Sequence, residues 1–268
     1  MKNLWTPLSV YILTYNSERY LDALLSRIAS VADELLIVDS GSTDQTEAIA
    51  GRHGCRFVYH PLDNFRDQRE FALRTCRHRM VLMLDSDEIP DPGLVGHIAE
   101  LKEHGFAHDA YQIRRHWYVM GQPVTCMYPV ESPDFVVRLV DRDAVTFIGH
   151  RMVHERPLGY QTLGQLRGAV SHYTFETPAE MARKLERYST LAARDLIELG
   201  VRPGWLHVLA YPPMVWVKWY LVKGGWKDGR LGWTIGCFVW RYTHRKFSVA
   251  RRLSRTRPVP SPDWQPAA

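Results

Sequence analysis

Acidic side chains gather directly after an apolar segment in the first third of the chain. Asp85, Asp87 and Glu88 follow the apolar run 80–84. Three carboxylates within four residues repel one another unless a cation neutralises them. Carboxylate oxygens suit Mg²⁺ and Mn²⁺, hard cations that commonly bridge protein carboxylates to the phosphates of a substrate. The spacing of Asp85 and Asp87 therefore predicts a divalent metal site.

Polar residues also follow two other apolar segments, 8–13 and 34–38. Thr14 and Asn16 come after the first, and the second is followed by the polar stretch 39–44, Asp-Ser-Gly-Ser-Thr-Asp. In an open parallel sheet, ligands bind at the carboxyl ends of the strands. Asp, Asn, Ser and Thr are also common in turns and as helix N-caps, so each stretch alone has a structural explanation. Three such strand ends together favour a ligand site.

The elements that would carry these residues alternate between strands and helices. Short apolar runs predict strands over 8–14, 34–39, 56–60 and 80–84, and apolar residues three and four positions apart predict helices near 20–28, 46–50 and 67–77. This alternation predicts an α/β fold with a mainly parallel sheet flanked by helices. Beyond Asp91 the pattern predicts a helix over 94–104 and strands over 110–115 and 135–140.

The composition changes at about residue 178. We predict a catalytic domain over 1–177, a helical C-terminal extension over 178–257 and a disordered, proline-rich tail over 258–268. In the extension a tryptophan recurs every seven residues among lysines and arginines, at Trp219, Trp226, Trp233 and Trp240. Helices with aromatic and cationic faces are typical of membrane interfaces. The alternative is that these tryptophans pack on the catalytic domain, and glycines 224, 225, 229, 232 and 236 argue against one continuous helix.

The net charge of +5 over 268 residues is the average of two opposite regions. Residues 218–257 contain eleven lysines and arginines and one acidic residue, Asp228, which leaves 23 basic and 28 acidic residues elsewhere. The basic region favours an anionic membrane surface over nucleic acid as a partner. The four cysteines form no CxxC pair, which indicates a reducing compartment. No run reaches the roughly 18–20 apolar residues of a membrane-spanning helix.

Taken in order, these segments resemble the GT-A glycosyltransferases of family 2, and within them the lipopolysaccharide core β-1,4-glucosyltransferase-like branch. The resemblance covers roughly residues 8–245 and rests on the stretches 8–18, 32–44, 67–72, 81–88, 153–155, 171–173 and 184–189. It implies a Rossmann-like, nucleotide-sugar-binding GT-A sheet and an inverting transfer of sugar from a nucleotide-diphosphate donor.

The resemblance also implies the site residues. Those that would bind the donor are Thr14, Asn16, Glu18, Asp39, Ser42, Asp44, Gln68, Arg69 and Asp85. The metal ion, Mg²⁺ or Mn²⁺, would be held by Asp85, Asp87 and His172, although a lone histidine before an aromatic residue is more often structural.

An inverting transfer needs a base to take the proton of the acceptor hydroxyl. Glu155 is the first choice for this catalytic base and Asp134 is the second. The alternative is that both carboxylates are ion-pair partners of an arginine, with Arg138, Arg151 and Arg156 as candidates. His150 and His154 are four residues apart, but without a third ligand they do not indicate a zinc site.

The sequence thus predicts a metal-dependent inverting glycosyltransferase that moves a hexose or heptose to a lipid-linked saccharide, such as lipopolysaccharide core or another cell-envelope glycan. We expect a cytoplasmic protein, peripheral on the inner face of the cytoplasmic membrane, with anionic lipids and no nucleic acid as partners. A sugar nucleotidyltransferase is one alternative, but it would normally have a glycine-rich basic loop where this chain has residues 14–18, Thr-Tyr-Asn-Ser-Glu. A nonenzymatic membrane binder would leave the polar strand ends unexplained.

Overall fold

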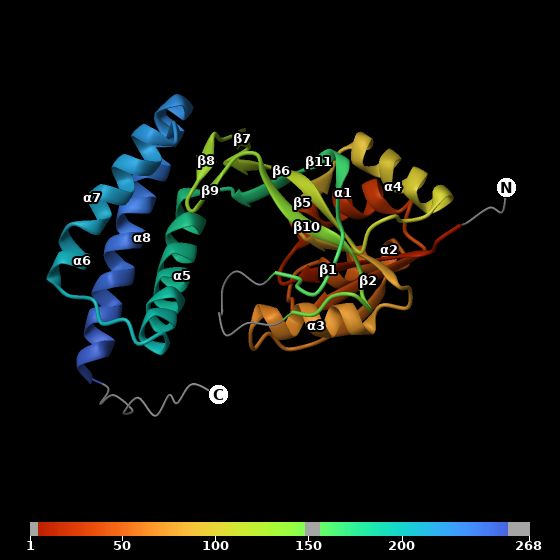
Figure 1. Ribbon diagram of the computed structural model, residues 1–268, viewed down its shortest axis with the longest axis horizontal. Coiled ribbons are helices and arrows are strands. Elements are labelled where there is room, and N and C mark those ends of the chain that lie inside the picture. Colours follow the sequence, from red (N-terminus) through yellow and green to blue (C-terminus); the bar gives the residue numbers. More distant parts are fainter. Residues whose placement is uncertain (1–4, 148–155, 257–268) are drawn as a thin grey trace. The chain divides into compact units, whose positions relative to one another are not determined.

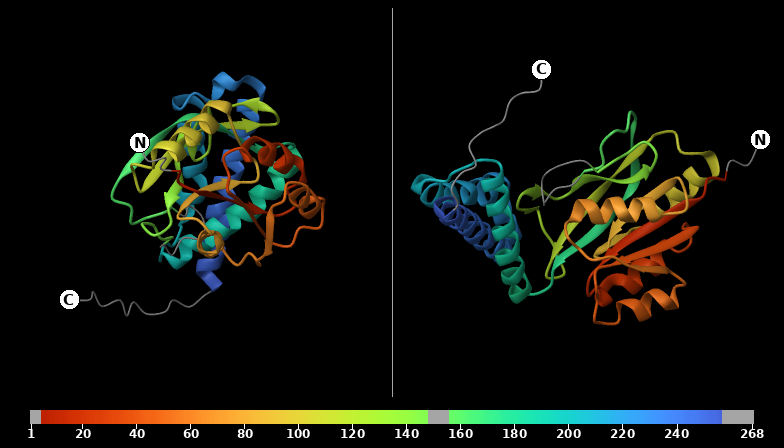
Figure 2. Two further views of the ribbon diagram at one scale, coloured as in Figure 1. Left: turned by 90° about the vertical axis from the view of Figure 1, so that its right-hand side faces the viewer. Right: turned by 90° about the horizontal axis from the view of Figure 1, so that it is seen from below.

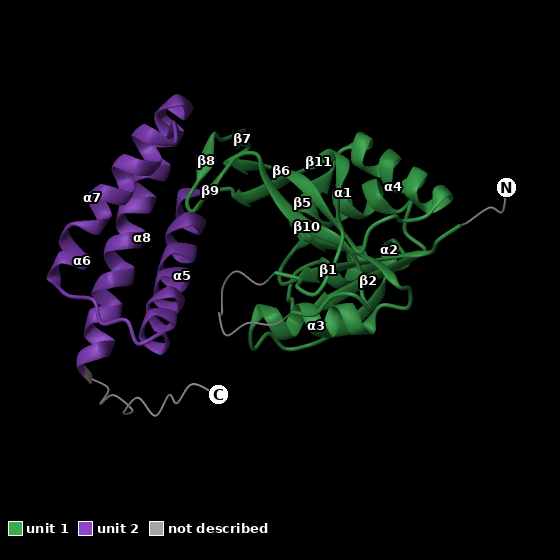
Figure 3. Cartoon of the chain, in the orientation of Figure 1, with its two compact units in different colours: residues 1–176 green, residues 177–268 purple. Residues whose placement is uncertain are grey.

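The computed structural model describes residues 5–147 and 156–256 (Figure 1). Contacts within the chain divide it into two compact units, residues 1–176 and 177–268, which are coloured separately in Figure 3. All described strands belong to the first unit, and the described part of the second is helical.

The first half of the first unit alternates strictly between strands and helices. Its elements are β1 (Leu8–Thr14), α1 (Glu18–Ile28), β2 (Glu34–Asp39), α2 (Thr46–Arg52), β3 (Arg56–Tyr59), α3 (Phe65–Thr75) and β4 (Met80–Asp85). The strands lie in the order β3-β2-β1-β4 and all four run parallel. The predicted α/β sheet is confirmed. Thr14 is level with Asp39, and Leu13 is level with Asp85, so the polar strand ends lie at one edge.

The second half of this unit makes the sheet mixed. Its elements are β5 (Glu88–Pro90), α4 (Pro92–His104), β6 (Ala110–Val119), β7 (Gln122–Pro123), β8 (Cys126–Met127), β9 (Val130–Glu131), β10 (Asp134–Asp141) and β11 (Leu163–Phe175). β10 is antiparallel to both β4 and β6, β11 is parallel to β6, and β5 is antiparallel to β11. The sequence analysis predicted α4, β6 and β10 but missed β5 and β11. β5 has only three residues, and the register of β11 shifts between Gln165 and Ala169.

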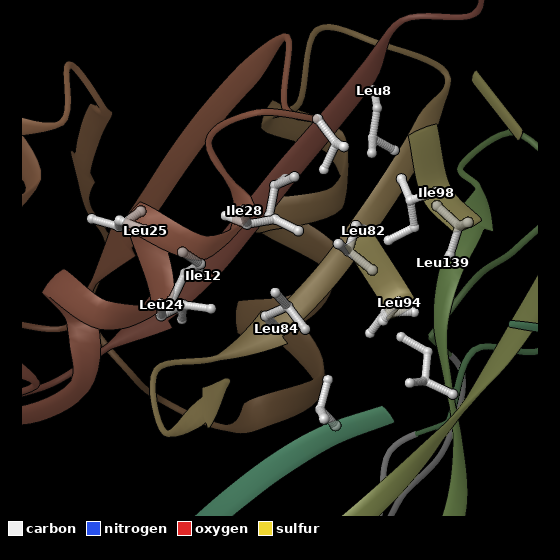
Figure 4. Close-up of a cluster of buried hydrophobic side chains, with 14 of the residues drawn as sticks. Leu8, Ile12, Leu24, Leu25, Ile28, Leu82, Leu84, Leu94, Ile98 and Leu139 are labelled. Atoms are coloured by element: carbon white, nitrogen blue, oxygen red, sulfur yellow. The ribbon is translucent and has the colours of Figure 1, made fainter. Parts of the chain in front are cut away.

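Helices cover both faces of the sheet (Figures 1 and 2). On one face, α1, α2 and α4 pack on β1 and β4, and Figure 4 shows Leu24 and Ile28 of α1 beside Ile12 and Leu84 of the strands. On the other face, Leu73 of α3 packs against the opposite side chains of the same strands. Strands that are buried on both faces read as continuous apolar runs, which is why β1 and β4 could be recognised from the sequence.

The second unit consists of α5 (Pro178–Glu198), α6 (Trp205–Leu209), α7 (Tyr211–Trp216), the π-helical segment η1 (Val217–Val222), the 3-10 segment η2 (Gly225–Asp228) and α8 (Gly229–Thr256). α5 and α8 pack side by side (Figure 1). Among the described helices, none is long and apolar enough to cross a membrane.

The prediction that this region is not one continuous helix is confirmed, although not every glycine interrupts it. The path breaks at Gly224, whose φ of 81° favours glycine, but α8 continues through Gly232 and Gly236. A Cβ atom on Gly232 would lie 1.8 Å from the carbonyl oxygen of Gly225, and one on Gly236 would lie 2.9 Å from Nε1 of Trp216. These two glycines permit close packing on α8 and do not end the helix.

Candidate functional site

The ends of β1 and β2 meet in a hydrogen-bonded pair of buried side chains. The Thr14 hydroxyl donates to Oδ2 of Asp39 at 2.7 Å. Oδ1 of Asp39 accepts the backbone N–H groups of Gly41 at 2.8 Å and Ser42 at 2.7 Å, and the Ser42 hydroxyl donates to Oδ2 at 2.5 Å. Asp39 therefore shapes the loop after β2 from a position at the sheet edge.

The loops after β1 and β2 are tied to each other by the other predicted donor-binding residues. Asn16 donates its backbone N–H to the Ser42 hydroxyl at 2.8 Å, and its side-chain oxygen accepts the N–H of Thr43 at 2.8 Å. Asp44 accepts the N–H of Glu18 at 3.0 Å, and the Glu18 carboxylate accepts the N–H of Gln45 at 3.0 Å. The structural explanation, that these residues stabilise turns, therefore holds for these side chains. It is compatible with a role in ligand binding.

Two neighbouring residues of α3 reach different strand ends. Gln68 is buried; its side-chain oxygen accepts from Nδ1 of His60 at 2.6 Å, and its side-chain nitrogen donates to the Ser40 hydroxyl at 3.1 Å. Arg69 donates to Oδ1 of Asp85 at 2.8 Å. α3 therefore links the ends of β2, β3 and β4 into one edge.

The acidic cluster after β4 is neutralised by arginines. Arg138 of β10 donates from one nitrogen to Oδ2 of Asp85 and to Oε1 of Glu88, both at 2.6 Å. Burial by itself would raise the pKa of Asp85, but Arg138 and Arg69 hold it below its ordinary value. Two guanidinium groups therefore neutralise part of the repulsion between these carboxylates, and the metal site at Asp85 stays a prediction.

Glu88 connects this cluster to a second ion pair. Its side chain is fully buried, and besides Arg138 it accepts from Nη1 of Arg115 at 3.1 Å. Arg115 in turn makes a bidentate contact with Asp134, at 3.0 and 2.7 Å, and Trp117 donates its indole N–H to Asp134 at 3.0 Å. Burial would raise the pKa of Glu88, but Arg138, His172 and Arg115 hold it well below its ordinary value. Asp134 thus forms an ion pair with an arginine, as the alternative predicted, but its partner is Arg115, which was not among the candidates.

His172 reaches the cluster through the pairing of β5 with β11, which sets it opposite Glu88. Its Nε2 lies 3.5 Å from Oδ2 of Asp87, and its Nδ1 lies 3.5 Å from Oε1 of Glu88. The imidazole also stacks on the indole of Trp117, with ring centroids 4.4 Å apart. Burial would lower the pKa of His172, but Asp87 and Glu88 raise it above its ordinary value.

The acidic cluster offers a small set of side chains to the metal that the sequence predicts. In the ranges that the structure describes, no group of three or more His, Cys, Asp or Glu side chains is arranged to hold a metal ion. Both oxygens of Asp85 face guanidinium groups, which leaves Asp87 and His172 as a facing carboxylate and imidazole. Mg²⁺ binds through one or two carboxylates and completes its shell with water and substrate phosphates. Asp87 and His172 are a donor pair of the kind that such an ion accepts beside water and phosphate.

Sequence reasoning missed Arg115 and Trp117, which lie on β6 with no motif around them. It named Glu88 in the acidic cluster and Arg138 as a possible ion-pair partner, but not their contact with each other. Glu155, the first choice for the base, lies outside the described residues, as do His150 and His154.

Comparison with known proteins gives three findings. The model of the family described as glycosyl transferase family 2 matches residues 9–128. The lipopolysaccharide core biosynthesis glycosyltransferase LpsC of Rhizobium meliloti (strain 1021) is 30% identical over 232 residues, which cover 84% of this chain and 85% of LpsC. An uncharacterized glycosyltransferase of Rickettsia bellii (strain RML369-C) is 25% identical over 80% of this chain and 74% of its own length.

Among solved structures, glucosyl-3-phosphoglycerate synthase from Mycobacterium tuberculosis, crystallised with Mn²⁺, uridine diphosphate and glucosyl-3-phosphoglycerate, is similar with a TM-score of 0.47. It is 19% identical, over 74% of this chain and 82% of that one.

Proposed function

This chain belongs to glycosyltransferase family 2, and from that premise we propose that it transfers a sugar from a nucleotide-diphosphate sugar to a lipid-linked saccharide with inversion at the sugar carbon. The observation that carries the proposal is the common edge formed by the ends of β1, β2 and β4. Thr14, Asp39 and Asp85 stand there at adjacent strand ends. This is the edge at which open α/β sheets bind nucleotides.

The donor would bind over the two loops that follow β1 and β2. Thr14 and Asp39 provide a buried hydroxyl and carboxylate beneath it, and Asn16, Glu18, Ser42 and Asp44 hold the loops in one shape. Gln68 and Arg69 of α3 border the same edge, where a guanidinium suits the donor's diphosphate. Asp85 would act here by fixing Arg69 and Arg138.

Asp87 and His172 would hold the divalent cation, Mg²⁺ or Mn²⁺, together with the donor's phosphates. When bound, such an ion stabilises negative charge on a departing diphosphate. Glu155 would take the proton of the acceptor hydroxyl. Asp134 is the second candidate for this role, and its bidentate contact with Arg115 and its bond from Trp117 count against it because they engage both of its oxygens.

We also propose a division of labour along the chain. Residues 1–177 would bind the donor and catalyse transfer, and the helical extension 178–257 would hold the enzyme peripherally at the cytoplasmic face of the membrane that carries the acceptor. The likeness to a lipopolysaccharide core glycosyltransferase supports a lipid-linked acceptor, since that polysaccharide is built on a lipid anchor. The cationic extension supports contact with an anionic membrane surface.

Thermal unfolding with a panel of UDP-, GDP- and ADP-sugars tests the proposal, each sugar being added with and without Mn²⁺. A ligand that binds only the native state stabilises it by about 2.7 kcal/mol at 100 times its Kd. We expect one nucleotide class to raise the melting temperature in the presence of Mn²⁺, and Asp87→Ala to reduce this increase. If no nucleotide sugar stabilises the wild-type protein, the proposed donor site is wrong.

A further inference from the structure

Large apolar side chains are exposed mainly in one part of the helical unit. Eleven of the nineteen that are exposed among the described residues lie between residues 205 and 240, a segment of 36 residues. We call them the apolar surface; they are Trp205, Leu206, Leu209, Tyr211, Met214, Val217, Leu221, Val222, Trp226, Trp233 and Trp240. Proteins rarely expose apolar side chains at this density unless the surface contacts a partner or a membrane.

The members of the apolar surface are spaced to share helix faces. Met214, Val217 and Leu221 are three and four residues apart along α7 and η1. Trp233 and Trp240 are seven residues apart on α8, which is two helical turns. The same helices bury a different set, including Trp219 and Val239. The segment is therefore amphipathic, with its core on one side and exposed apolar side chains on the other.

An apolar groove lies within this surface. It has a volume of about 340 Å³ and is lined by Trp216, Trp233, Cys237, Trp240 and Arg241. Trp216 packs edge-to-face on Trp233, with ring centroids 5.9 Å apart, and Gly236 lets Trp216 approach α8. Three indoles and one cation form a lining suited to a hydrocarbon chain that ends near an anionic group.

The charge of the same segment is strongly one-sided. Residues 205–256 contain ten lysines and arginines and one acidic residue, Asp228. Lys218 and Lys227 are exposed beside members of the apolar surface, and Lys227 lies 6.0 Å from the ring centre of Trp226. Two copies of this surface would repel each other, whereas a bilayer with anionic lipids attracts it. Tryptophan with lysine is also the combination found at the level of lipid headgroups.

We propose that the apolar surface inserts into the interfacial layer of a bilayer containing anionic phospholipid, with one acyl chain in the groove and its phosphate near Arg241. The helices then lie on the membrane without crossing it, as amphipathic helices of this kind do. The inference rests on the proposed function, because the membrane contact would serve to bring the catalytic unit to a lipid-linked acceptor. It assigns the contact to named residues of α6, α7, η1, η2 and α8.

Flotation of the full chain with lipid vesicles is the test. Vesicles of phosphatidylcholine are compared with vesicles of phosphatidylcholine and phosphatidylglycerol. We expect partitioning to be about tenfold stronger on the anionic vesicles, because several lysines and arginines face the headgroups. Added salt should reduce this difference, because the charges are exposed.

Two variants with matched controls separate the apolar and the charge contributions. The double variant Leu221→Ser with Val222→Ser removes two exposed side chains, 50% and 74% exposed, and should weaken partitioning about tenfold or more. Leu163→Ser in the first unit, where the side chain is 43% exposed, is its control and should change nothing. Lys218→Glu should weaken binding to the anionic vesicles alone, whereas Arg27→Glu on α1 has the same charge change and should not.

The proposal is overturned if the wild-type chain does not float or if the serine double variant floats equally well. It is also overturned if sedimentation shows a dimer that the double variant dissociates while vesicles bind neither protein, because the surface then contacts a second copy. Thermal stabilisation by a nucleotide sugar with Mn²⁺ is measured on the same samples. Loss of vesicle binding with that stabilisation intact contradicts only the membrane inference, and the reverse result contradicts only the proposed donor site.

Discussion

Glu88 joins two arginines from different strands at the centre of the site. Its side chain is fully buried and accepts from Arg115 on β6 and Arg138 on β10, which hold Asp134 and Asp85 in turn. Removing one partner from such a buried group leaves charge uncompensated in a place that water reaches poorly. The positions of Asp85 and Asp134 therefore depend in part on this residue.

Replacing Glu88 by Gln should lower the free energy of unfolding by about 3 kcal/mol, because the two arginines lose a shared anion. Urea unfolding at neutral pH measures the change. Glu103→Gln, an exposed position at the end of α4, is the control and should stay within about 0.5 kcal/mol of the wild type. Equal stability of the two variants would contradict the structural importance of the network.

Substitution of Asp87 is the most direct test of the proposed cation. Asp87→Ala should reduce release of nucleoside diphosphate from the donor sugar by about 100-fold or more, since it removes a group that acts on the departing charge. The melting temperature without ligand should change far less than in the Glu88→Gln variant, because the contact of Asp87 with His172, at 3.5 Å, is longer than the contacts of Glu88 with its arginines, at 3.1 and 2.6 Å. Asp22→Ala, on the exposed side of α1, is the control.

The role of the metal is ruled out if the Asp87→Ala variant has the same rate as the wild type and the wild-type protein keeps its full rate in EDTA.

At the scale of elements, Glu34 of β2 links its own strand to β1, to β3 and to the start of β4. It lies at the end of the sheet opposite the polar strand ends. Its carboxylate accepts from the Ser9 hydroxyl on β1 at 2.6 Å, from the N–H of Arg77 before β4 at 2.6 Å, and from Arg56 on β3 at 3.1 Å. Burial would raise the pKa of Glu34, but these donors lower it below its ordinary value of 4.5. The parallel half of the sheet is therefore held at its amino end by one ionised group.

This shift predicts how stability depends on pH. A carboxylate with a lowered pKa in the folded state contributes stability that is present above its unfolded value, near pH 4.5, and is lost as the pH falls. Glu34→Gln should cost about 2 kcal/mol at pH 7 and reduce the slope of stability against pH below about pH 5. Urea unfolding across this range tests it, with Glu47→Gln on α2 as the exposed control. An unchanged slope would contradict the assignment.

Gly232 and Gly96 offer a comparison between two helices. A methyl group at Gly232 of α8 would meet the Gly225 carbonyl oxygen at 1.8 Å, whereas one at Gly96 of α4 meets nothing within 4 Å. Gly232→Ala should therefore destabilise the helical unit by about 1–3 kcal/mol through overpacking. Gly96→Ala should stabilise the protein by about 0.5–1 kcal/mol, since alanine restricts the unfolded chain and favours helix. Chemical denaturation of both variants measures these changes, and the same sign for both would contradict the packing argument.

At the scale of the whole molecule, the chain contains two units with separate internal contacts, residues 1–176 and 177–268 (Figure 3). The proposed donor site belongs wholly to the first and the apolar surface wholly to the second. The net charge of +5 is therefore of little use as a single number, because we propose a different partner for each unit.

Calorimetry of the full chain should show two unfolding transitions. A nucleotide sugar with Mn²⁺ should raise only the transition of the first unit, because a ligand stabilises the unit that binds it. Gly232→Ala should lower only the other transition. A single transition that moves as a whole under both changes would mean that the two units unfold together.

The sequence alone determined the parallel half of the sheet and the positions of its polar ends. Fully buried parallel strands read as uninterrupted apolar runs, and polar residues at their carboxyl ends share one edge, so Thr14, Asp39 and Asp85 could be placed together. These signals are local, extending over a few consecutive residues. The membership in family 2 was likewise predictable from the order of such stretches.

Only the tertiary structure decided what neutralises the acidic cluster. Arg115 and Arg138 reach Glu88 because β6 and β10 fold into the sheet, and His172 reaches it because β11 pairs with β5. An ion pair between strands that are far apart in the sequence produces no periodic pattern in either strand. Its energy comes from burial and charge, and its geometry depends on the register of the strands. For the same reason the two arginines beside Asp85 could not be predicted from the sequence, whereas its role as a metal ligand stays a prediction.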